Sequence, residues 1–190
     1  TSSDESPSHT YALDGTYTVT LTVTSDEGCE DVSTHSITVN DSPTALFSAS
    51  IECEGTATTF TNLSTGDGVL TYSWDFGDSS PLSTDANPTY TYATDGTYTV
   101  VLTVTNDNSC VSTSTVSVTV NNLPNADFTF SDVCEGTPAD FVNTSDAGTY
   151  NWDLGDGNSS TLTDVSHIYS TFGTYDVTLT VTSPQFCISS

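Results

Sequence analysis

The chain has 190 residues, of which 25 are acidic and none is lysine or arginine, so its formal net charge is −25. Binding to phosphate backbones depends on Lys and Arg, so this composition excludes nucleic acid as a partner, and it excludes docking on an anionic membrane for the same reason. The sequence has no apolar run of the roughly 18 residues that cross a bilayer. Residues 1–30 lack the basic and apolar regions of a signal peptide, so any export signal is expected outside these residues.

Internal repeats define the units of the chain. The segment "TYALDGTYTVTLTVTSDEGCE" at 10–30 recurs at 91–111 and 169–189, and the segment at 43–64 recurs at 124–145. These repeats predict three domains. Residues 1–41 are the C-terminal part of one domain, residues 42–122 are a complete domain, and residues 123–190 are a domain that lacks its last strand. The chain is therefore expected to be a window on a longer array.

The predicted elements are β-strands in every copy. Turn residues at 13–15 precede an alternating strand in the first copy, and a turn at 93–96 does so in the second. Along 97–105, Tyr98, Val100, Leu102 and Val104 alternate with residues that are mostly Thr, which is the period of a strand with one buried face. Units of about eighty residues with some seven strands predict an all-β fold, made of tandem immunoglobulin-like β-sandwich domains in an end-to-end array.

A repeated Trp-Asp motif, "WDFGDSS" at 74–80 and "WDLGDGN" at 152–158, is the strongest candidate for chemistry. Trp74 and Phe76 have the same parity, so both are expected to face the core while Asp75 points outward. The glycine and aspartate that follow suit a turn in which a carboxylate accepts backbone N–H bonds. We favour this structural turn over a catalytic carboxylate pair, and over a Ca²⁺ site with the weak candidate ligands Asp75, Asp78, Asp153 and Asp156. No cofactor is expected.

The histidines and hydroxyl residues form no catalytic or metal-binding pattern. His9 and His167 occupy the same repeat position, so we expect a packing or hydrogen-bonding role for them, whereas His35 stands alone. No Cys and His residues have the spacing of a zinc site, and no Gly-x-Ser-x-Gly motif frames a nucleophile. The chain is not expected to be an enzyme.

The sequence resembles the PKD (polycystic kidney disease) domain family over nearly its whole length. The resemblance rests on "YSWDFGD…PTYTYATDGTYTVVLTVTN" in the second unit and "YNWDLGDGNSS…SHIYSTFGTYDVTLTVT" in the third, and residues 8–24 match the last third of the family pattern. The family has a histidine at one position of this pattern, which is His9 in the first unit and His167 in the third, but Tyr90 occupies it in the second unit. The resemblance implies a Trp that starts a central strand before a tight turn. The expected structural core includes Trp74, Trp152, Tyr17, Tyr98 and Tyr175.

The five cysteines fall into two repeat-equivalent classes. One class precedes "EGT" between the first two strands of a unit, and the other lies at the turn between the last two strands. Such regular placement predicts disulfides, and hence an oxidising, extracellular setting. The first class is Cys53 and Cys134; the second is Cys29, Cys110 and Cys187.

Two disulfide schemes are open. Either each domain closes on itself, through Cys53–Cys110 and Cys134–Cys187, or Cys53–Cys187 joins neighbouring domains. In the immunoglobulin-like strand order that the resemblance implies, the two turns of one domain lie at opposite poles, roughly 25 Å apart. A disulfide needs Cα atoms about 4.4–6.8 Å apart. We therefore expect Cys53–Cys187, with Cys29, Cys110 and Cys134 paired to cysteines outside these residues.

The function implied by the resemblance is structural. Similar acidic, Cys-bearing PKD repeats occur in giant secreted adhesins and appendage proteins of Bacteroidota-type bacteria. We expect a stalk or filament segment on the cell surface, with neighbouring repeats of the chain, and other copies in a filament, as partners. The alternative is a carbohydrate- or protein-binding accessory module of a secreted hydrolase. Tandem repetition with near-identical spacing favours the stalk, whereas a binding module is expected to expose an aromatic platform in one unit only.

Overall fold

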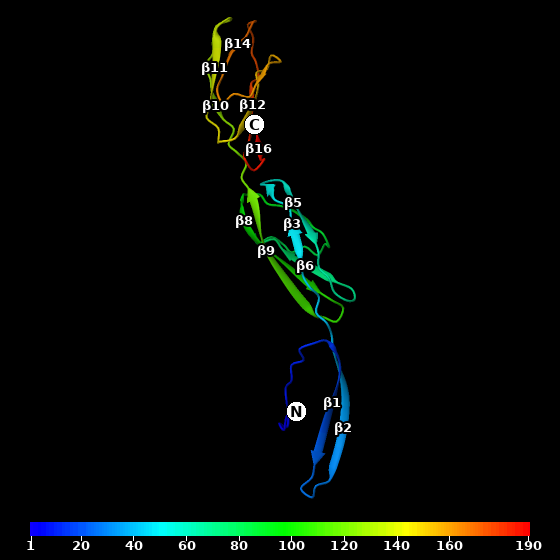
Figure 1. The fold of residues 1–190 in the computed structure, drawn as a ribbon. Coiled ribbons are helices and arrows are strands. Elements are labelled where there is room, and N and C mark those ends of the chain that lie inside the picture. Colours follow the sequence, from blue (N-terminus) through cyan, green and yellow to red (C-terminus); the bar gives the residue numbers. More distant parts are fainter. The chain divides into compact units, whose positions relative to one another are not determined.

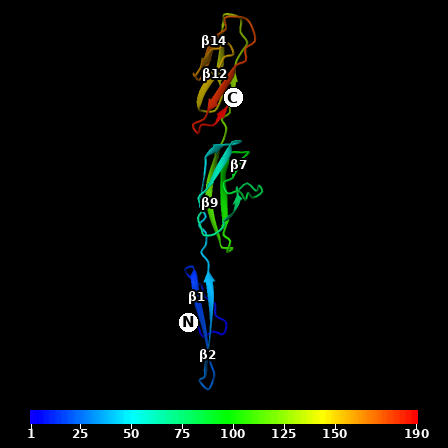
Figure 2. The ribbon, with the colours of Figure 1, turned by 90° about the vertical axis from the view of Figure 1, so that its right-hand side faces the viewer.

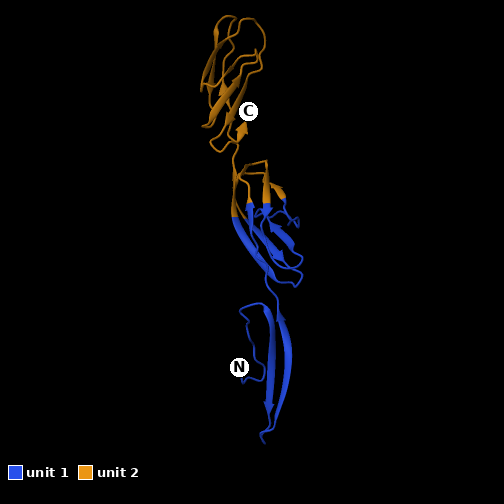
Figure 3. Ribbon diagram, turned by 45° about the vertical axis from the view of Figure 1, so that its right-hand side comes forward, with its two compact units in different colours: residues 1–48, 61–88, 100–116 blue, residues 49–60, 89–99, 117–190 orange.

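The computed structural model describes all 190 residues and consists of the strands β1 to β16 (Figure 1). It contains no helix of a length and apolarity that would cross a membrane. By contact density the chain divides into two compact units (Figure 3). One unit comprises residues 1–48, 61–88 and 100–116, and the other comprises residues 49–60, 89–99 and 117–190.

The first repeat forms a two-stranded antiparallel hairpin, which is drawn in blue in Figures 1 and 2. The strands β1 (Gly15–Thr24) and β2 (Glu30–Val39) pair without interruption from Gly15↔Val39 to Thr24↔Glu30. Threonine and valine favour this extended pairing because their branched side chains fit a pleated surface. No second sheet covers the hairpin, so the apolar residues of β1 are exposed; Val19, Leu21 and Val23 are 48%, 61% and 57% exposed.

The second repeat contains seven strands in two sheets. The three-stranded sheet has the order β3-β5-β7, and the four-stranded sheet has the order β4-β9-β8-β6. The strands β5 and β7 pair in antiparallel fashion, as do β6 and β8, whereas β4 and β9 pair in parallel at Glu52↔Val120 and Cys53↔Asn121. The strands are β3 (Phe47–Ala49), β4 (Glu52–Cys53), β5 (Ala57–Asn62), β6 (Thr71–Asp75), β7 (Thr89–Thr91), β8 (Gly96–Thr105) and β9 (Val111–Asn121).

The third repeat has a similar division into two sheets, of order β10-β11-β14 and β13-β12-β15-β16. Its last strand, β16, pairs with β15 over only two residues. The sequence predicted that this last strand is absent, and the structure shows a short piece of it, which begins at Ile188. The strands are β10 (Phe128–Thr129), β11 (Pro138–Asn143), β12 (Thr149–Asp153), β13 (Ser159–Ser160), β14 (Val165–Ile168), β15 (Thr178–Thr182) and β16 (Ile188–Ser189).

The core of the third repeat lies between its two sheets. One sheet contributes Phe141 and Val165, and the other contributes Trp152, Leu179 and Val181 to the same buried cluster. The alternating threonines of β15 point away from this cluster, as the period of two requires. The third repeat is therefore a β-sandwich, and the predicted all-β fold of tandem sandwich domains is correct.

The alternation predicted in the second repeat is also observed. Val100, Leu102 and Val104 on β8 are fully buried, and Trp74 and Phe76 are 0% and 3% exposed. The prediction was wrong for three tyrosines. Tyr17, Tyr98 and Tyr175 are only half-buried, and the fully buried tyrosine of the second repeat is Tyr92.

These three half-buried tyrosines act at the edge of the fold through their hydroxyl groups. Tyr17, Tyr98 and Tyr175 each donate a hydrogen bond to the carbonyl oxygen four residues earlier, over 2.9, 2.8 and 2.9 Å. The carbonyl oxygens that accept these bonds belong to the exposed turn before the strand, so each phenol lies at the rim of its repeat. The three side chains brace this turn and are not part of the sandwich interior.

Candidate functional site

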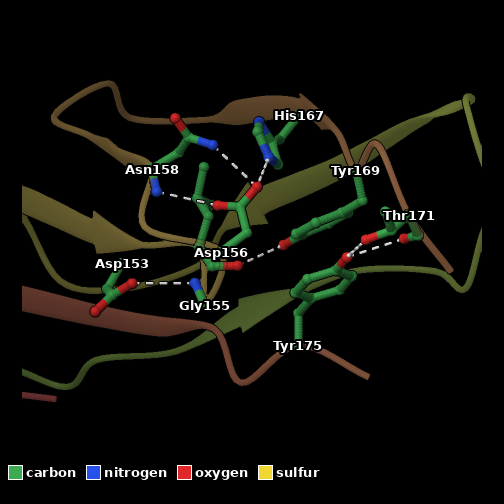
Figure 4. A network of polar contacts seen from close by, with 9 residues as sticks. Asp153, Gly155, Asp156, Asn158, His167, Tyr169, Thr171 and Tyr175 are labelled. Atoms are coloured by element: carbon green, nitrogen blue, oxygen red, sulfur yellow. Dashed lines mark hydrogen bonds and ion pairs between the residues drawn. The ribbon is translucent and has the colours of Figure 1, made fainter. Parts of the chain in front are cut away.

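The Trp-Asp motif forms a self-contained turn at the end of β12, so Trp152 lies near the end of its strand and not at the start, as the resemblance had implied. Trp152 is fully buried, and its Nε1–H donates to the carbonyl oxygen of Leu162 over 2.9 Å. Asp153 Oδ1 accepts the backbone N–H of Gly155 over 3.0 Å (Figure 4). Gly155 has a φ of +77°, and a Cβ there would lie 2.6 Å from the carbonyl oxygen of Asp176, so only glycine fits.

The second half of the turn is held in the same way. Asp156 Oδ1 accepts the backbone N–H of Asn158 over 3.0 Å, and Asp156 Oδ2 accepts from the Asn158 side chain over 2.9 Å. In the second repeat, Asp75 and Asp78 likewise accept the backbone N–H groups of Gly77 and Ser80. The four carboxylates considered for Ca²⁺ thus bind their own turns. The structure has no group of three or more His, Cys, Asp or Glu residues that could hold a metal ion.

One ion pair is added to the turn in the third repeat. His167 Nε2 lies 2.7 Å from Asp156 Oδ2 (Figure 4). This hydrogen bond, aided by those from Asn158, lowers the pKa of Asp156 from 3.8 to about 2. The histidine is therefore a hydrogen-bonding residue, as its repeat position suggested, and its partner is the second aspartate of the motif.

An aromatic stack continues from this ion pair. The ring of His167 lies edge-on to Tyr169 at 4.6 Å, and Tyr169 stacks on Tyr175 at 4.0 Å. The hydroxyl of Tyr169 donates to the carbonyl oxygen of Leu154 over 2.9 Å, and its burial, followed by the charge of Asp156, raises the pKa of the phenol. The first repeat has the same His–Tyr–Tyr series at residues 9, 11 and 17, and the second repeat has Tyr90 in the histidine position.

A disulfide joins the second repeat to the third. Cys53 at the end of β4 is bonded to Cys187, the residue before β16, with the two Cα atoms 5.7 Å apart. This is the pairing expected between neighbouring domains. It rules out both Cys53–Cys110 and Cys134–Cys187 within single domains, because each cysteine forms only one disulfide.

The cysteines of each class lie in equivalent turns. Cys187 and Cys110 accept hydrogen bonds at their carbonyl oxygens from the N–H groups of Ser183 and Asn106, and Cys29 accepts one from Ser25. In the other class, the carbonyl oxygens of Cys53 and Cys134 accept from the N–H groups three residues later. Cys29, Cys110 and Cys134 are free thiols in this chain.

An open pocket of about 600 Å³ lies in the third repeat, between residues 128–141 and residues 169–177. Its aromatic lining includes Phe130 and Phe172, which are 62% and 88% exposed. The repeat-equivalent residues of the second repeat are Ala49 and Asp95. The aromatic identity of this pair is therefore specific to one unit. The pocket also has an acidic lining, formed by Asp132, Glu135 and Asp176.

The pocket lies beside a stretch of chain that differs between the two repeats. In the second repeat, β4 pairs with the end of the eleven-residue strand β9, whereas the equivalent strand of the third repeat, β16, spans only two residues, so residues 133–134 have no strand to pair with. Residues 131–138 are all exposed. The sequence alone did not predict this pocket, although Phe130 and Phe172 are aromatic residues without an aromatic counterpart in the second repeat.

Comparison with known proteins agrees with the repeat pattern. The model of the PKD domain matches residues 1–39, 40–120 and 121–186. Collagenase ColA of Bacillus cereus is 46% identical over 56 residues, which is 30% of this chain and 6% of the collagenase. Human polycystin-1 is 36% identical over 125 residues, which is 62% of this chain and 3% of polycystin-1. The chain thus spans only a small part of the length of either relative.

The solved structures that resemble this chain include a PKD domain. The PKD1 domain of the Vibrio cholerae metalloprotease PrtV is 36% identical, and the match covers 43% of this chain and 99% of that domain with a TM-score of 0.39. Since the family model matches nearly the whole sequence in three consecutive copies, the chain belongs to the PKD domain family.

Proposed function

We propose that this PKD repeat region is an extracellular accessory module of a secreted hydrolase, and that it binds protein or carbohydrate for a catalytic domain elsewhere in the protein. The observation that carries this proposal is the aromatic pair Phe130 and Phe172, which lines a pocket of the third repeat and has no aromatic counterpart in the second repeat. Exposed aromatic rings next to polar groups are typical of binding surfaces. The similarity to part of a collagenase supports the same function.

The charge of the chain restricts the ligand. Asp132, Glu135 and Asp176 line the pocket, and the chain has no Lys or Arg to offset them. An anionic ligand would be repelled, so the ligand is neutral or cationic, such as a collagen-type protein or a neutral polysaccharide. The disulfide supports the extracellular location, because such bonds persist in oxidising environments. The chain itself takes no part in catalysis under this proposal.

Co-sedimentation tests the proposal. The chain is incubated with collagen fibrils and, separately, with chitin beads, at about 0.15 M NaCl so that long-range repulsion is screened. We expect it to sediment with at least one of them. The double variant Phe130→Ala/Phe172→Ala should bind at least tenfold more weakly. Phe186→Ala is the matched control, since Phe186 is 83% exposed in the same repeat but does not line the pocket.

A second candidate function is the stalk or filament segment. The covalent link between the second and third repeats favours it, because a module that only binds needs no fixed connection between repeats. Placement in an adhesin of Bacteroidota-type bacteria is supported by the sequence resemblance alone, and none of the three similar proteins named above is an adhesin by name. If the chain sediments with neither material, or if the double variant binds as well as the parent, the stalk becomes the better proposal.

A further inference from the structure

The Cys53–Cys187 disulfide closes a large covalent ring. The two cysteines are 134 residues apart in the sequence, and the ring between them contains all strands from β5 to β15. Only β3 and β4 of the second repeat lie before the Cys53 end of the ring, and only β16 follows Cys187. The first repeat lies entirely outside the ring.

The disulfide is therefore the shortest covalent route through these two repeats. Along the backbone, 134 residues extend to about 440–480 Å at ~3.3–3.6 Å per residue. Through the disulfide, the Cα atoms of the same two residues are 5.7 Å apart. A pull on the two ends of the chain is carried by the shorter route, because the longer one stays slack until the shorter one breaks.

The core of the third repeat belongs to the part of the backbone between the two cysteines, which carries no tension while the disulfide is intact. Its buried cluster, from Ala139 on β11 to Val181 on β15, is wholly inside the ring. Two pairings connect a strand that carries the tension to a strand inside the ring, namely β3 with β5 and β4 with β9. Tension would peel β3 and β4 away while leaving the sandwich core of the third repeat without load.

The first repeat is exposed to the same pull without protection. The hairpin of β1 and β2 would be pulled apart from the end where Gly15 pairs with Val39. Antiparallel strands loaded from one end separate one residue pair at a time, so each step breaks only a few hydrogen bonds. In the 190-residue chain, this two-stranded hairpin is expected to extend first.

We infer that the Cys53–Cys187 disulfide is a tension-bearing bridge, which keeps residues 54–186 out of the mechanical path of the protein. This function is independent of ligand binding and goes beyond the proposed accessory role. It requires no contact between the repeats other than the covalent bond itself.

Single-molecule force measurement tests the inference. The parent protein carries Cys29→Ser, Cys110→Ser and Cys134→Ser, which remove the three free thiols, and is held through peptide tags at both termini. The comparison protein also carries Cys53→Ser and Cys187→Ser. Peptide mapping under non-reducing conditions first establishes that the parent contains the Cys53–Cys187 bond; a parent without that bond contradicts the inference.

The two proteins should differ in their full extension. The parent should extend to about 200 Å at ~3.6 Å per residue, since only the residues outside the ring are stretched. The comparison protein should reach about 680 Å. A parent that extends as far as the comparison protein while the bond is intact would overturn the inference.

Addition of a thiol reductant to the parent under constant force provides a second readout on the same molecule, so it does not depend on the folding of the comparison protein. We expect the bond to break and the third repeat then to resist before it unfolds in a separate event. An immediate gain of the whole additional length, about 480 Å, would show that the ring had already unfolded under load and that the inference is wrong.

Discussion

Replacement of Trp152 by Phe should destabilise the third repeat by about 3 kcal/mol. The indole is fully buried, and its Nε1–H donates to the Leu162 carbonyl over 2.9 Å. Loss of that hydrogen bond costs about 1 kcal/mol. The missing ring atoms cost about 1 kcal/mol in transfer free energy, and a cavity of about 40 Å³ at ~24 cal/mol per Å³ costs about 1 kcal/mol more.

Urea denaturation followed by hydrogen exchange measures this loss in each repeat separately. With an m-value of about 1 kcal/mol/M, the midpoint for peptides from β11 to β15 should fall by about 3 M. Peptides of the second repeat should keep their midpoint, and the fluorescence of Trp74, then the only indole, gives an independent reading of that repeat. Trp74→Phe is the matched control, because Trp74 is equally buried and donates to the Asp85 carbonyl over 2.9 Å.

A loss of less than about 1 kcal/mol in the free energy of unfolding of the third repeat would contradict this prediction for Trp152→Phe. Such a result would mean that the pocket side of the sandwich relaxes into the vacated space and that water replaces the indole as donor to Leu162. An equal loss in both repeats would contradict the assignment of Trp152 to a core of its own.

Three further results are expected. The folded-state pKa of Asp156 is about 2, against an ordinary 3.8, so its contact with His167 stabilises the third repeat above about pH 4. This contribution is lost as the pH falls towards 2. Acid unfolding of the Asp156→Asn variant should lack this pH-dependent loss, whereas the control variant Asp153→Asn should retain it. Tyr175→Phe should lower the free energy of unfolding by about 1 kcal/mol in urea titrations, because the hydrogen bond to the Thr171 carbonyl is lost. The melting temperature of the chain should rise with NaCl, since screening weakens repulsion within a net charge of −25, and CaCl₂ at equal ionic strength should raise it no further; a clear excess with CaCl₂ would reveal a specific site.

The sequence predicted the features that depend on strand periodicity and on the repeat itself. The parity of Trp74 and Phe76 placed both in the core, because neighbouring side chains on a strand face opposite sides. The repeat positions of Cys53 and Cys187, combined with the strand order of an immunoglobulin-like fold, were sufficient to propose the bonded pair. Both arguments need only the order of the elements and the length of a strand.

The sequence did not predict features that depend on how an element ends. Tyr98 shares the parity of Val100, yet it lies where β8 begins, and its hydroxyl needs a carbonyl at the rim. The partner of His167 is eleven residues earlier in another turn, which no short-range pattern indicates. The pocket beside Phe130 depends on which strands cover residues 131–138, and this is a property of the assembled sandwich.

The turn before each cysteine of the second class leaves one position free to vary. Gly28, Ser109 and Phe186 occupy that position with φ values of +81°, +63° and +65°, so the backbone shape is retained although two of the residues are not glycine. A left-handed conformation disfavours a bulky residue by roughly 1 kcal/mol or more. The hydrogen bonds of the turn impose this backbone conformation, so the Cα–Cβ bond at the tip points in the same direction for any side chain. A library of substitutions at this position would change what the tip presents without moving the cysteine beside it, which makes these turns suited to the engineering of display scaffolds.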